Sequence, residues 1–459
     1  MKLYSRLFTT LAASMTLFGC ALSPTSSPVQ SGDVSSSVDP RPGLRKNYVR
    51  ASGKELVGED EKNILLRGTN VGGMFIPERW MCLTDCADLL QTINILTERF
   101  SRKEAFELLD IYQQNFWTEE DWSNVTELGI NCLRLPISYA DVYDTEFDLL
   151  RFDEIDPEEL PLIRKKIRED HLSKIDAFID EAERHGIYIV LDLHGAFGSQ
   201  NGNDHSIDSR GHDWLWYPDA LGEEFRKMNV ELWQYLATRY RGFRNIAGYD
   251  LLNEPAGDSS DKGCVTSLTT KTQWDYFDVL YKAIREIDPN HLLIMESCWT
   301  ANDLPNPKTY GWENIMYEFH HYEGGGVGED DYQITSYANR VKNIVGADFG
   351  IPLYMGEFCP HASYEAWEKI LANFNQNHIN WTTWTYRVKY VNNEWGLYGI
   401  STSNEDLPRS EIPAILRGND SYSEIARKWG EAQRNGNRKN EGLCEVVSAA
   451  AKAAIDFSK

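Results

Sequence analysis

Two glutamates, Glu254 and Glu357, each follow an apolar run of the chain and are the residues best suited to acid–base and nucleophilic chemistry. Glu254 stands in the sequence Asn-Glu-Pro, and Glu357 stands in the sequence Gly-Glu-Phe. Two carboxyl groups that face each other can divide such work, with one protonating a leaving oxygen and the other attacking the carbon that it leaves. An isolated glutamate is more often a solvated loop residue, so this chemistry depends on a fold that brings the two side chains together.

Eight short apolar runs, separated by amphipathic helical stretches, are the elements that could position these glutamates. The runs cover residues 64–71, 131–137, 188–193, 246–252, 292–296, 315–319, 353–358 and 381–386. The helical patterns cover residues 171–185, 225–240, 274–287, 332–345, 364–375 and, after the last run, 422–432. Strands that alternate with helices are joined by right-handed parallel crossovers, and eight such units can close into a barrel.

We therefore predict an α/β fold with a single (β/α)8 TIM barrel over residues 46–440 and a C-terminal tail over 441–459. The length beyond a minimal barrel is expected in long loops after strands 1, 2, 3 and 8. A doubly wound open sheet is the structural competitor. It is disfavoured because Gly68, Gly72 and Gly73 lack the spacing of a phosphate-binding turn and do not lead directly into a helix.

Polar residues concentrate at the predicted C-terminal ends of the strands, where barrel enzymes carry their catalytic groups. In chain order they are Arg134, His194, Asn253, Glu254, His320, Tyr322, Glu357 and Trp384. His320 and Tyr322 share one face of their strand because side chains alternate with a period of two, which turns His321 toward the helices. No single one of these residues is specific, but their order and placement together indicate one polar site at one end of the barrel.

This conjunction resembles glycoside hydrolase family 5, whose order of motifs the chain follows from about residue 55 to 430. The resemblance implies that Glu254 is the acid/base and Glu357 the nucleophile of a retaining, double-displacement hydrolysis. Arg134 and Tyr322 are expected to hold Glu357 ionised, Asn253 to bond the sugar 2-hydroxyl, and Trp384 to offer an apolar platform for the sugar. We also expect the charge of Glu357 to raise the pKa of Glu254, so that Glu254 carries a proton near neutral pH.

A finer resemblance links two segments to the exo-β-1,3-glucanases of the family, namely residues 192–202 and 68–80. After Trp384 the chain departs from those glucanases and continues into residues 393–396, where they have a different acidic segment. The expected substrate is a β-glucan or gluco-oligosaccharide. Exo action and the 1,3 linkage stay open, and an endo-β-1,4-glucanase is the alternative specificity.

Several other side chains could bind the saccharide. Asn70 and Glu78 could bond hydroxyls of the non-reducing sugar, or could equally make hydrogen bonds within loops and at the bottom of the barrel. Tryptophans in segments that follow strands could stack on pyranose rings, and these are Trp80, Trp214, Trp216, Trp299 and Trp395.

Two other function classes compete with a glycosidase. A non-catalytic glycan-binding lipoprotein would have no need of both glutamates. A metal-dependent hydrolase could draw on several histidines, namely His194, His205, His212, His320 and His321. The chain has no His-x-His on the first strand and no close set of ligands, so we expect neither a metal nor a cofactor.

The N-terminus has the features of an export signal. Lys2 and Arg6 precede an apolar stretch over residues 7–19 that is too short to cross a bilayer, and it ends in Leu-Phe-Gly-Cys. This ending resembles the lipobox of bacterial lipoproteins, in which the cysteine, here Cys20, is acylated. The resemblance predicts a signal peptide over residues 1–19, a flexible Ser/Pro linker over 20–45, and a lipoprotein anchored to a bilayer on the outer-membrane, periplasmic or cell-surface side.

The net charge of the chain argues against nucleic acid as a partner. The 459 residues are 42% hydrophobic and carry a formal charge of −24, and a field of that sign repels the phosphates of nucleic acid. A monomer is the default expectation. Two cysteine pairs could form disulfides in an oxidising compartment, Cys82 with Cys86 and Cys264 with Cys298.

Overall fold

The computed structural model describes residues 45–145, 165–255, 269–297, 300–324, 329–391, 395–402, 407–435 and 437–458. The predicted signal peptide, Cys20 and the linker up to residue 44 lie outside the described residues, as do Cys264, Cys298 and Trp299.

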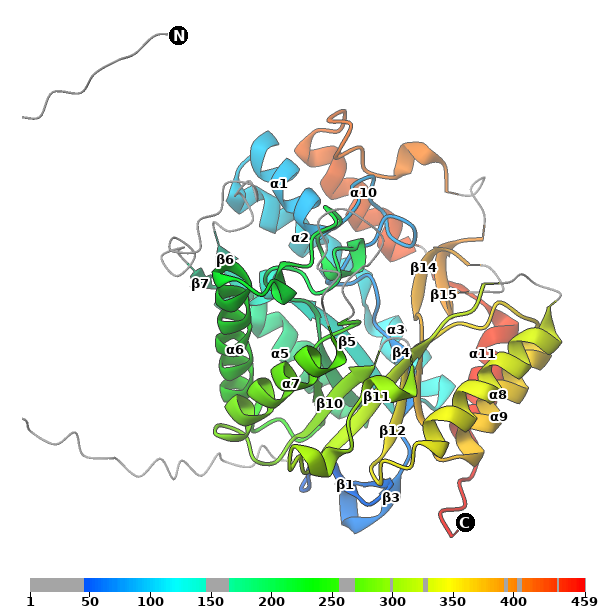
Figure 1. Ribbon diagram of the computed structural model, residues 1–459. Coiled ribbons are helices and arrows are strands. Elements are labelled where there is room, and N and C mark those ends of the chain that lie inside the picture. Colours follow the sequence, from blue (N-terminus) through cyan, green and yellow to red (C-terminus); the bar gives the residue numbers. More distant parts are fainter. Residues whose placement is uncertain are drawn as a thin grey trace, which may run out of the picture. The chain divides into compact units, whose positions relative to one another are not determined.

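The predicted barrel is confirmed, because eight parallel strands close on themselves (Figure 1). In order around the barrel they are β4 (Arg67–Asn70), β5 (Cys132–Ser138), β8 (Tyr188–Gly195), β9 (Ile246–Asp250), β10 (Leu292–Ser297), β11 (Ile315–His321), β12 (Leu353–Phe358) and β13 (Asn380–Thr383). Each coincides with one of the eight predicted runs. Strands of a parallel barrel are covered on both faces, and every residue of β5 and β8 is accordingly buried.

The predicted helices also form and cover the outside of the barrel. They are α5 (Glu169–Arg184), α6 (Ala220–Tyr240), α7 (Thr270–Arg285), α8 (Asp330–Gly346) and α9 (Tyr364–Gln376). Helix α5 buries the predicted stripe that contains Leu172, Ile175 and Ile179, and Gly186 follows the helix with a φ of +72°. A positive φ suits glycine, which explains why the helix stops there.

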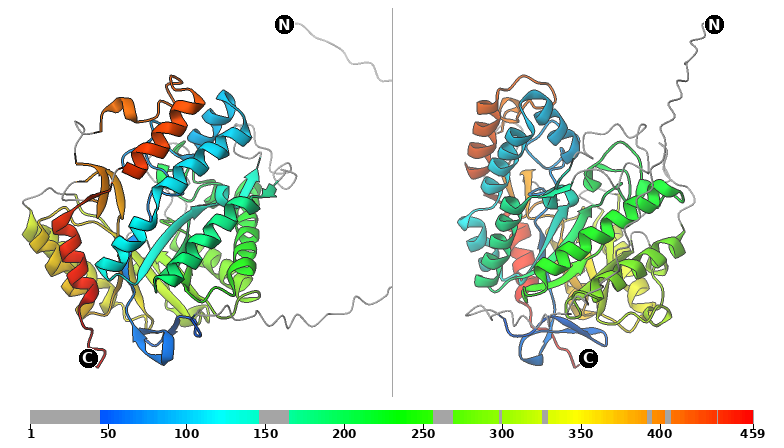
Figure 2. Two further views of the ribbon diagram at one scale, coloured as in Figure 1. Left: turned by 180° about the vertical axis from the view of Figure 1, so that it is seen from behind. Right: turned by 90° about the vertical axis from the view of Figure 1, so that its left-hand side faces the viewer.

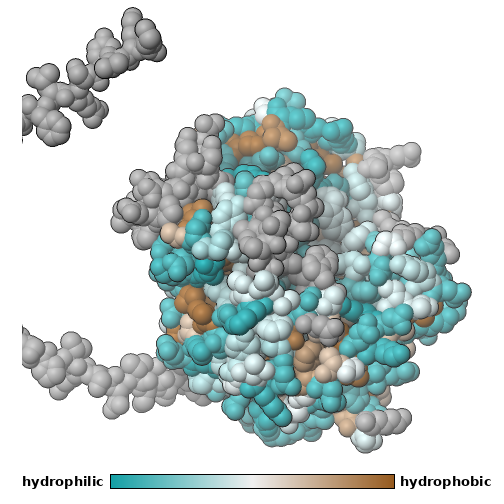
Figure 3. Space-filling model, in the orientation of Figure 1, coloured by the Kyte–Doolittle hydropathy of each residue, from teal (hydrophilic) through white to brown (hydrophobic). Residues whose placement is uncertain are grey.

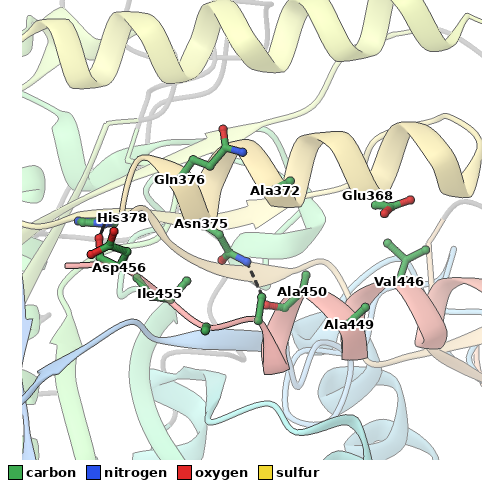
Figure 4. A pocket seen from close by; sticks show the side chains of 12 residues that line it. Glu368, Ala372, Asn375, Gln376, His378, Val446, Ala449, Ala450, Ile455 and Asp456 are labelled. Atoms are coloured by element: carbon green, nitrogen blue, oxygen red, sulfur yellow. Dashed lines mark hydrogen bonds between the residues drawn. The ribbon is translucent and has the colours of Figure 1, made fainter. Parts of the chain in front are cut away.

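The C-terminal segment is not a tail, which corrects the expectation for residues 441–459. Its helix α11 (Glu441–Lys452) packs against α9 and against α3 (Glu119–Leu128), as Figure 2 shows. Asn375 Nδ2 on α9 donates to the carbonyl oxygen of Ala450 at 3.0 Å, beside a pocket between the two helices (Figure 4). Arg67 donates to the carbonyl oxygens of Ala450 and Ala453 at 3.0 and 2.8 Å, so α11 is tied to the first barrel strand.

The predicted loop after strand 1 contains three helices that the sequence reading missed, namely α1 (Leu89–Arg99), α2 (Arg102–Phe116) and α3. Helix α2 packs against both α1 and α10 (Tyr422–Asn435), so α10 belongs to this group and not to the ring around the barrel. The remaining short elements are α4 (Tyr139–Val142), the sheet of β1 (Arg50–Ser52), β2 (Glu55–Val57) and β3 (Asn63–Ile64), the pair β6 (Tyr143–Thr145) and β7 (Lys165–Ile167), and the sheet of β14 (Arg387–Tyr390), β15 (Tyr398–Ser401) and β16 (Arg438–Lys439).

The structure also corrects two expectations about buried side chains, one for a cysteine pair and one for two tryptophans. Cys82 and Cys86 are buried free thiols and form no disulfide with each other. Trp214 and Trp216 belong to the hydrophobic core and are 5% and 2% exposed, so they form no open cleft wall.

The side chains inside the barrel change from apolar to charged along the barrel axis. On β5, β8, β10 and β11, every second side chain points inward. Toward the start of each strand these side chains belong to one buried apolar cluster, which includes Cys132, Val190, Ile294 and Met316. The next inward residues are charged, and all have no exposed surface: Arg134, Asp192, Glu296 and Glu318. The polar end of the barrel is therefore the C-terminal end of its strands, as expected for an enzyme site.

The outer surface is mostly hydrophilic on the face drawn in Figure 3, with hydrophobic residues in separate small patches. Among the described residues, no helix has both the length and the apolar composition needed to cross a membrane.

Candidate active site

Arg134 on β5 points into the barrel and organises the site. Its Nη1 donates to Glu357 Oε1 at 2.7 Å, and its Nε and Nη2 donate to Asp250 Oδ2 at 2.9 and 2.7 Å. Oxygens of Asp192 and Glu318 each lie 3.2 Å from the guanidinium. The planar fork of an arginine presents several donors at once, so this one buried cation contacts four buried acids.

Glu357 on β12 is held at both carboxylate oxygens. Arg134 binds Oε1, and the hydroxyl of Tyr322 donates to Oε2 at 2.8 Å. These are the two contacts that the sequence reading expected. The neighbouring Gly356 is required, because a Cβ at that position would lie 1.5 Å from Glu318 Oε1.

Glu254, at the end of β9, faces Glu357 across the barrel mouth. One carboxylate oxygen of each residue and a ring nitrogen of His320 all lie within 4.8 Å of one another. His320 Nδ1 lies 2.9 Å from Glu254 Oε1, and His205 Nε2 lies 3.0 Å from Glu254 Oε2. Each oxygen of Glu254 therefore has its own imidazole partner.

The backbone of Glu254 is strained, with a φ of +42° that non-glycine residues rarely adopt. Two buried side chains hold it there. The Glu254 N–H donates to the carboxylate of Glu296, and Asn201 Nδ2 donates to the Glu254 carbonyl oxygen at 3.2 Å. Strain of this kind is found where a side chain must be aimed at a site.

The structure reverses the expected direction of the pKa shift of Glu254. Burial acts to raise this pKa, but the charges and hydrogen bonds of His205 and His320 outweigh burial and hold it well below its usual range. Burial acts to lower the pKa of His320, but Glu296 and Glu357 outweigh it and raise that pKa well above its usual value. Glu254 is therefore ionised and its imidazole partners carry protons.

A layer of buried acids supports the site and was missed by the sequence reading. Its members are Asp192, Asp250, Glu296 and Glu318. Burial raises the pKa of Glu318 to about 8 and that of Glu296 well above its usual range. The signal was present in the sequence, because Asp192 and Glu318 stand two residues before His194 and His320 and so point into the barrel too.

His194, Asn253 and Trp384 form one side of the site. Nδ1 of His194 lies 2.6 Å from Asp192 Oδ2, and burial lowers the pKa of this histidine to about 3, so the ring is neutral. The ring stacks on Trp384 with centroids 5.5 Å apart and planes 4° apart. Asn253 Oδ1 accepts from Arg134 Nη2 at 2.8 Å, which orients the amide.

Asn70 makes hydrogen bonds within the barrel, which is one of the two roles that the sequence left open for it. Its Nδ2 donates to the carbonyl oxygens of Gly356 and Thr383 at 2.8 and 3.1 Å, and its Oδ1 accepts from Arg134 Nη1 at 3.2 Å. The side chain has no exposed surface. It therefore orients Arg134 and is not available to bind a sugar hydroxyl.

Glu78 lies close to the site with an unpartnered carboxylate oxygen. Trp80 Nε1 donates to Glu78 Oε2 at 2.7 Å, whereas Oε1 is buried and has no hydrogen-bond partner among the described residues. Burial raises the pKa of Glu78 to about 8, against the opposing charge of His205. Trp80 is 41% exposed and packs on Trp395 with ring centroids 4.9 Å apart, and Trp395 in turn lies 5.9 Å from the ring of Tyr322.

The five histidines named from the sequence do not form one cluster, because three lie at the site and two lie outside it. His194, His205 and His320 lie at the site, each beside a carboxylate. His321 points to α8 as predicted, with Nε2 at 3.0 Å from Ser336 Oγ. His212 stacks on the buried Trp214, with centroids 4.8 Å apart.

A model of the family described as cellulase (glycosyl hydrolase family 5) matches residues 99–389. This range contains both glutamates and the other six residues predicted at the strand ends, from Arg134 to Trp384. Among curated proteins, a β-xylosidase of Phanerodontia chrysosporium is 27% identical over 389 residues, which span 79% of this chain and 74% of that protein. A probable glucan 1,3-β-glucosidase A of Aspergillus fumigatus is 27% identical over 306 residues, and the match covers 64% of this chain and 65% of that protein.

Two solved structures resemble the fold. The rutinosidase from Aspergillus niger matches with a TM-score of 0.51 and 14% identity, over 72% of this chain and 92% of that one. An endogalactoceramidase matches with a TM-score of 0.51 and 17% identity, over 74% of each chain. At these identities the likeness concerns the barrel architecture alone.

Proposed function

Because the chain belongs to the cellulase family, glycosyl hydrolase family 5, we propose that it is a retaining O-glycosyl hydrolase of β-glucosidic bonds. The proposed substrates are β-glucans or gluco-oligosaccharides. The observation that carries this proposal is the approach of one carboxylate oxygen of Glu254 to within 4.8 Å of one of Glu357. Retaining enzymes hold their carboxyl groups roughly 5–5.5 Å apart, whereas inverting enzymes separate them by roughly 6.5–9.5 Å to admit a water.

In the proposed reaction, Glu357 attacks the anomeric carbon while Glu254 protonates the departing oxygen. Arg134 and Tyr322 bind both oxygens of Glu357 and hold the carboxylate in a fixed orientation. Once the glycosyl–enzyme ester forms, Glu254 removes a proton from the incoming water, which releases the sugar with its original configuration.

The remaining residues are proposed to bind the glycone. Asn253, already oriented by Arg134, would bond the 2-hydroxyl, and Trp384 would lie against the sugar ring. The unpartnered oxygen of Glu78 supports a hydrogen bond from a sugar hydroxyl. Trp395, packed between Trp80 and Tyr322, is suited to stacking on a pyranose.

Hydrolysis assays with defined substrates test this proposal. We expect release of the phenol from an aryl β-glucoside and of sugar from laminarin, a β-1,3-glucan. The β-xylosidase relative makes an aryl β-xyloside the matched comparison. Cleavage of carboxymethylcellulose in mid-chain would instead favour the endo-β-1,4-glucanase alternative, and no product from any β-glycan would favour a non-catalytic glycan-binding protein.

We also propose that the enzyme is exported and anchored to a bilayer through an acylated Cys20. The support is the order of features in the sequence: a positive start, a short apolar stretch and Leu-Phe-Gly-Cys. One acyl chain binds a membrane only marginally, so several chains on Cys20 would be needed for stable attachment.

The Cys20→Ala variant tests the anchor. Without the thiol no acyl chain can be attached, and we expect the protein to move from the membrane fraction to the soluble fraction. Ser27→Ala in the same linker is the control and should stay with the membrane. Retention of Cys20→Ala in the detergent phase would contradict the anchor.

A further inference from the structure

His205 joins Glu254 to a second acidic group outside the barrel. It lies in a short 3-10 helix, Asp204–Ser206, in the loop after β8. Its Nε2 lies 3.0 Å from Glu254 Oε2, and its Nδ1 lies 3.8 Å from Asp204 Oδ1. A ring nitrogen of His205 and carboxylate oxygens of Glu78 and Asp204 all lie within 4.8 Å of one another.

The groups that face His205 come from three other parts of the chain as well as its own loop. Glu78 comes from the segment after β4, Glu254 from the end of β9, and the neutral ring of His194 from β8, with ring centroids 6.4 Å apart. Its own loop supplies Asp204 and the amide of Asn201, whose Nδ2 lies 2.8 Å from His205 Nε2. Carboxylates thus lie on both sides of the imidazole.

The two imidazole partners of Glu254 differ in their access to water. The side chain of His320 is 3% exposed and is shared among carboxylates, because Glu296, Glu318 and Glu357 lie within 3.6 Å of its ring nitrogens. The side chain of His205 is 25% exposed. His205 is therefore the partner that can exchange a proton both with Glu254 and with solvent.

We propose that His205 is a positioning residue that holds, beside Glu254, the proton that Glu254 delivers to the departing sugar oxygen. This inference rests on the proposed acid/base role of Glu254. It assigns to the loop after β8 a part in the reaction that the strand-end residues do not supply.

The protons balance over the cycle. In the first step the proton on His205 Nε2 passes to Glu254 Oε2 and on to the glycosidic oxygen, as the bond from that oxygen to the anomeric carbon breaks and the bond to Glu357 forms. In the second step water adds to the anomeric carbon, the bond to Glu357 breaks, and the released proton returns through Glu254 to His205. The enzyme ends as it began.

The charges around the imidazole of His205 favour holding a proton on its ring. Burial acts to lower the pKa of His205, but the charge and hydrogen bond of Glu254, with Glu78 and Asp204, outweigh it and raise this pKa to about 9. The pair of His205 and Glu254 therefore keeps one shared proton up to about pH 9. Without the imidazole, the proton shared at this place would be lost at a lower pH, because a carboxyl group releases its proton at a lower pH than this imidazole does.

His205→Gln is the test, since glutamine can still donate a hydrogen bond to Glu254 but cannot carry the proton. The measurement is the pH profile of kcat/KM on two β-glucosides, one of phenol, which needs protonation to leave, and one of 2,4-dinitrophenol, which does not. On the phenyl substrate we expect a loss of about tenfold at neutral pH and a basic limb moved down by about one pH unit or more. On the dinitrophenyl substrate we expect little change.

Three further variants make the outcome decisive. Glu254→Ala should lose on the order of 10²–10⁴-fold on the phenyl substrate alone, the usual range for a general acid. Asp204→Asn, which leaves the imidazole in place, should move the basic limb in the same direction by less. His212→Gln, in the same loop but stacked on Trp214, should match the unaltered enzyme.

The results of these variants distinguish a failure of the role of His205 from a failure of the acid/base role of Glu254. An unchanged basic limb in both His205→Gln and Asp204→Asn, beside a collapse in Glu254→Ala, would overturn the role of His205 and leave the proposed function standing. Equal losses by His205→Gln on both substrates would also overturn it. If Glu254→Ala itself treated the two substrates alike, the acid/base role of Glu254 would be wrong.

Discussion

Glu357→Ala should remove turnover and then regain it when azide is added. Loss of the nucleophile is expected to lower kcat on the order of 10⁴–10⁶-fold, the range seen when a reacting side chain is deleted. The alanine leaves a space beside Arg134 and Tyr322 that a small anion can enter. With a dinitrophenyl β-glucoside, azide then forms its bond to the anomeric carbon as the phenolate leaves, and the product is a glycosyl azide of inverted configuration.

The configuration of that azide is the measurement that identifies Glu357, and it can be read by NMR. Glu365→Ala is the matched control, because Glu365 is an exposed glutamate on α9 that pairs only with the nearby Lys369 among the described residues. The Glu365→Ala variant should keep full activity and form no glycosyl azide. Failure of azide to rescue a correctly folded Glu357→Ala would speak against the nucleophile assignment.

Arg134→Met should be the most destabilising single change in the barrel. The substitution keeps an unbranched apolar stem but removes the cation that faces Asp192, Asp250, Glu318 and Glu357. Removal of one partner of a buried ion pair typically costs about 3–5 kcal/mol, because the other charge is left without compensation. The free energy of unfolding in urea measures this loss.

The direction in which the stability of Arg134→Met changes with pH separates the loss of the cation from a loss of packing. Burial already raises the pKa of Asp192 and of Glu318 while Arg134 opposes the shift, so loss of the cation raises both pKa values further and the folded variant binds more protons. The stability of the variant should therefore fall as the pH rises from about 5 to 8, more steeply than that of the unaltered protein. Arg184→Met on the exposed side of α5 should change stability by less than about 0.5 kcal/mol. A deficit in Arg134→Met that stays constant with pH would contradict the charge argument.

The barrel was predictable because its signals are local. A buried parallel strand needs an apolar run of a few residues, and a covering helix needs an apolar stripe, as in α5. The same period of two that assigned His320 to the site would have found Glu318 beneath it. The helices α1, α2 and α3 were missed because they stand within the length assigned to one loop. The helix α11 was taken for a tail because nothing local in its sequence shows that α3 and α9 need a cover.

The contacts of Asn70 with Arg134 and of His205 with Glu254 had no local signal. Asn70 and Arg134 are paired across neighbouring strands, and which atom of the amide meets the guanidinium depends on strand register. His205 reaches Glu254 only because the loop after β8 turns back over the barrel mouth. Sequence spacing carries no information on such an approach.

By itself, then, the order of residues along the chain determined the class of fold, the end of the barrel that carries polar groups and the two glutamates proposed for the chemistry. Only the tertiary structure decided the protonation of Glu254. A pKa depends on burial and on charges a few ångströms away, and both arise when strands far apart in the chain close into one barrel. This is why Glu254, expected to be protonated beside Glu357, is instead ionised between two imidazoles.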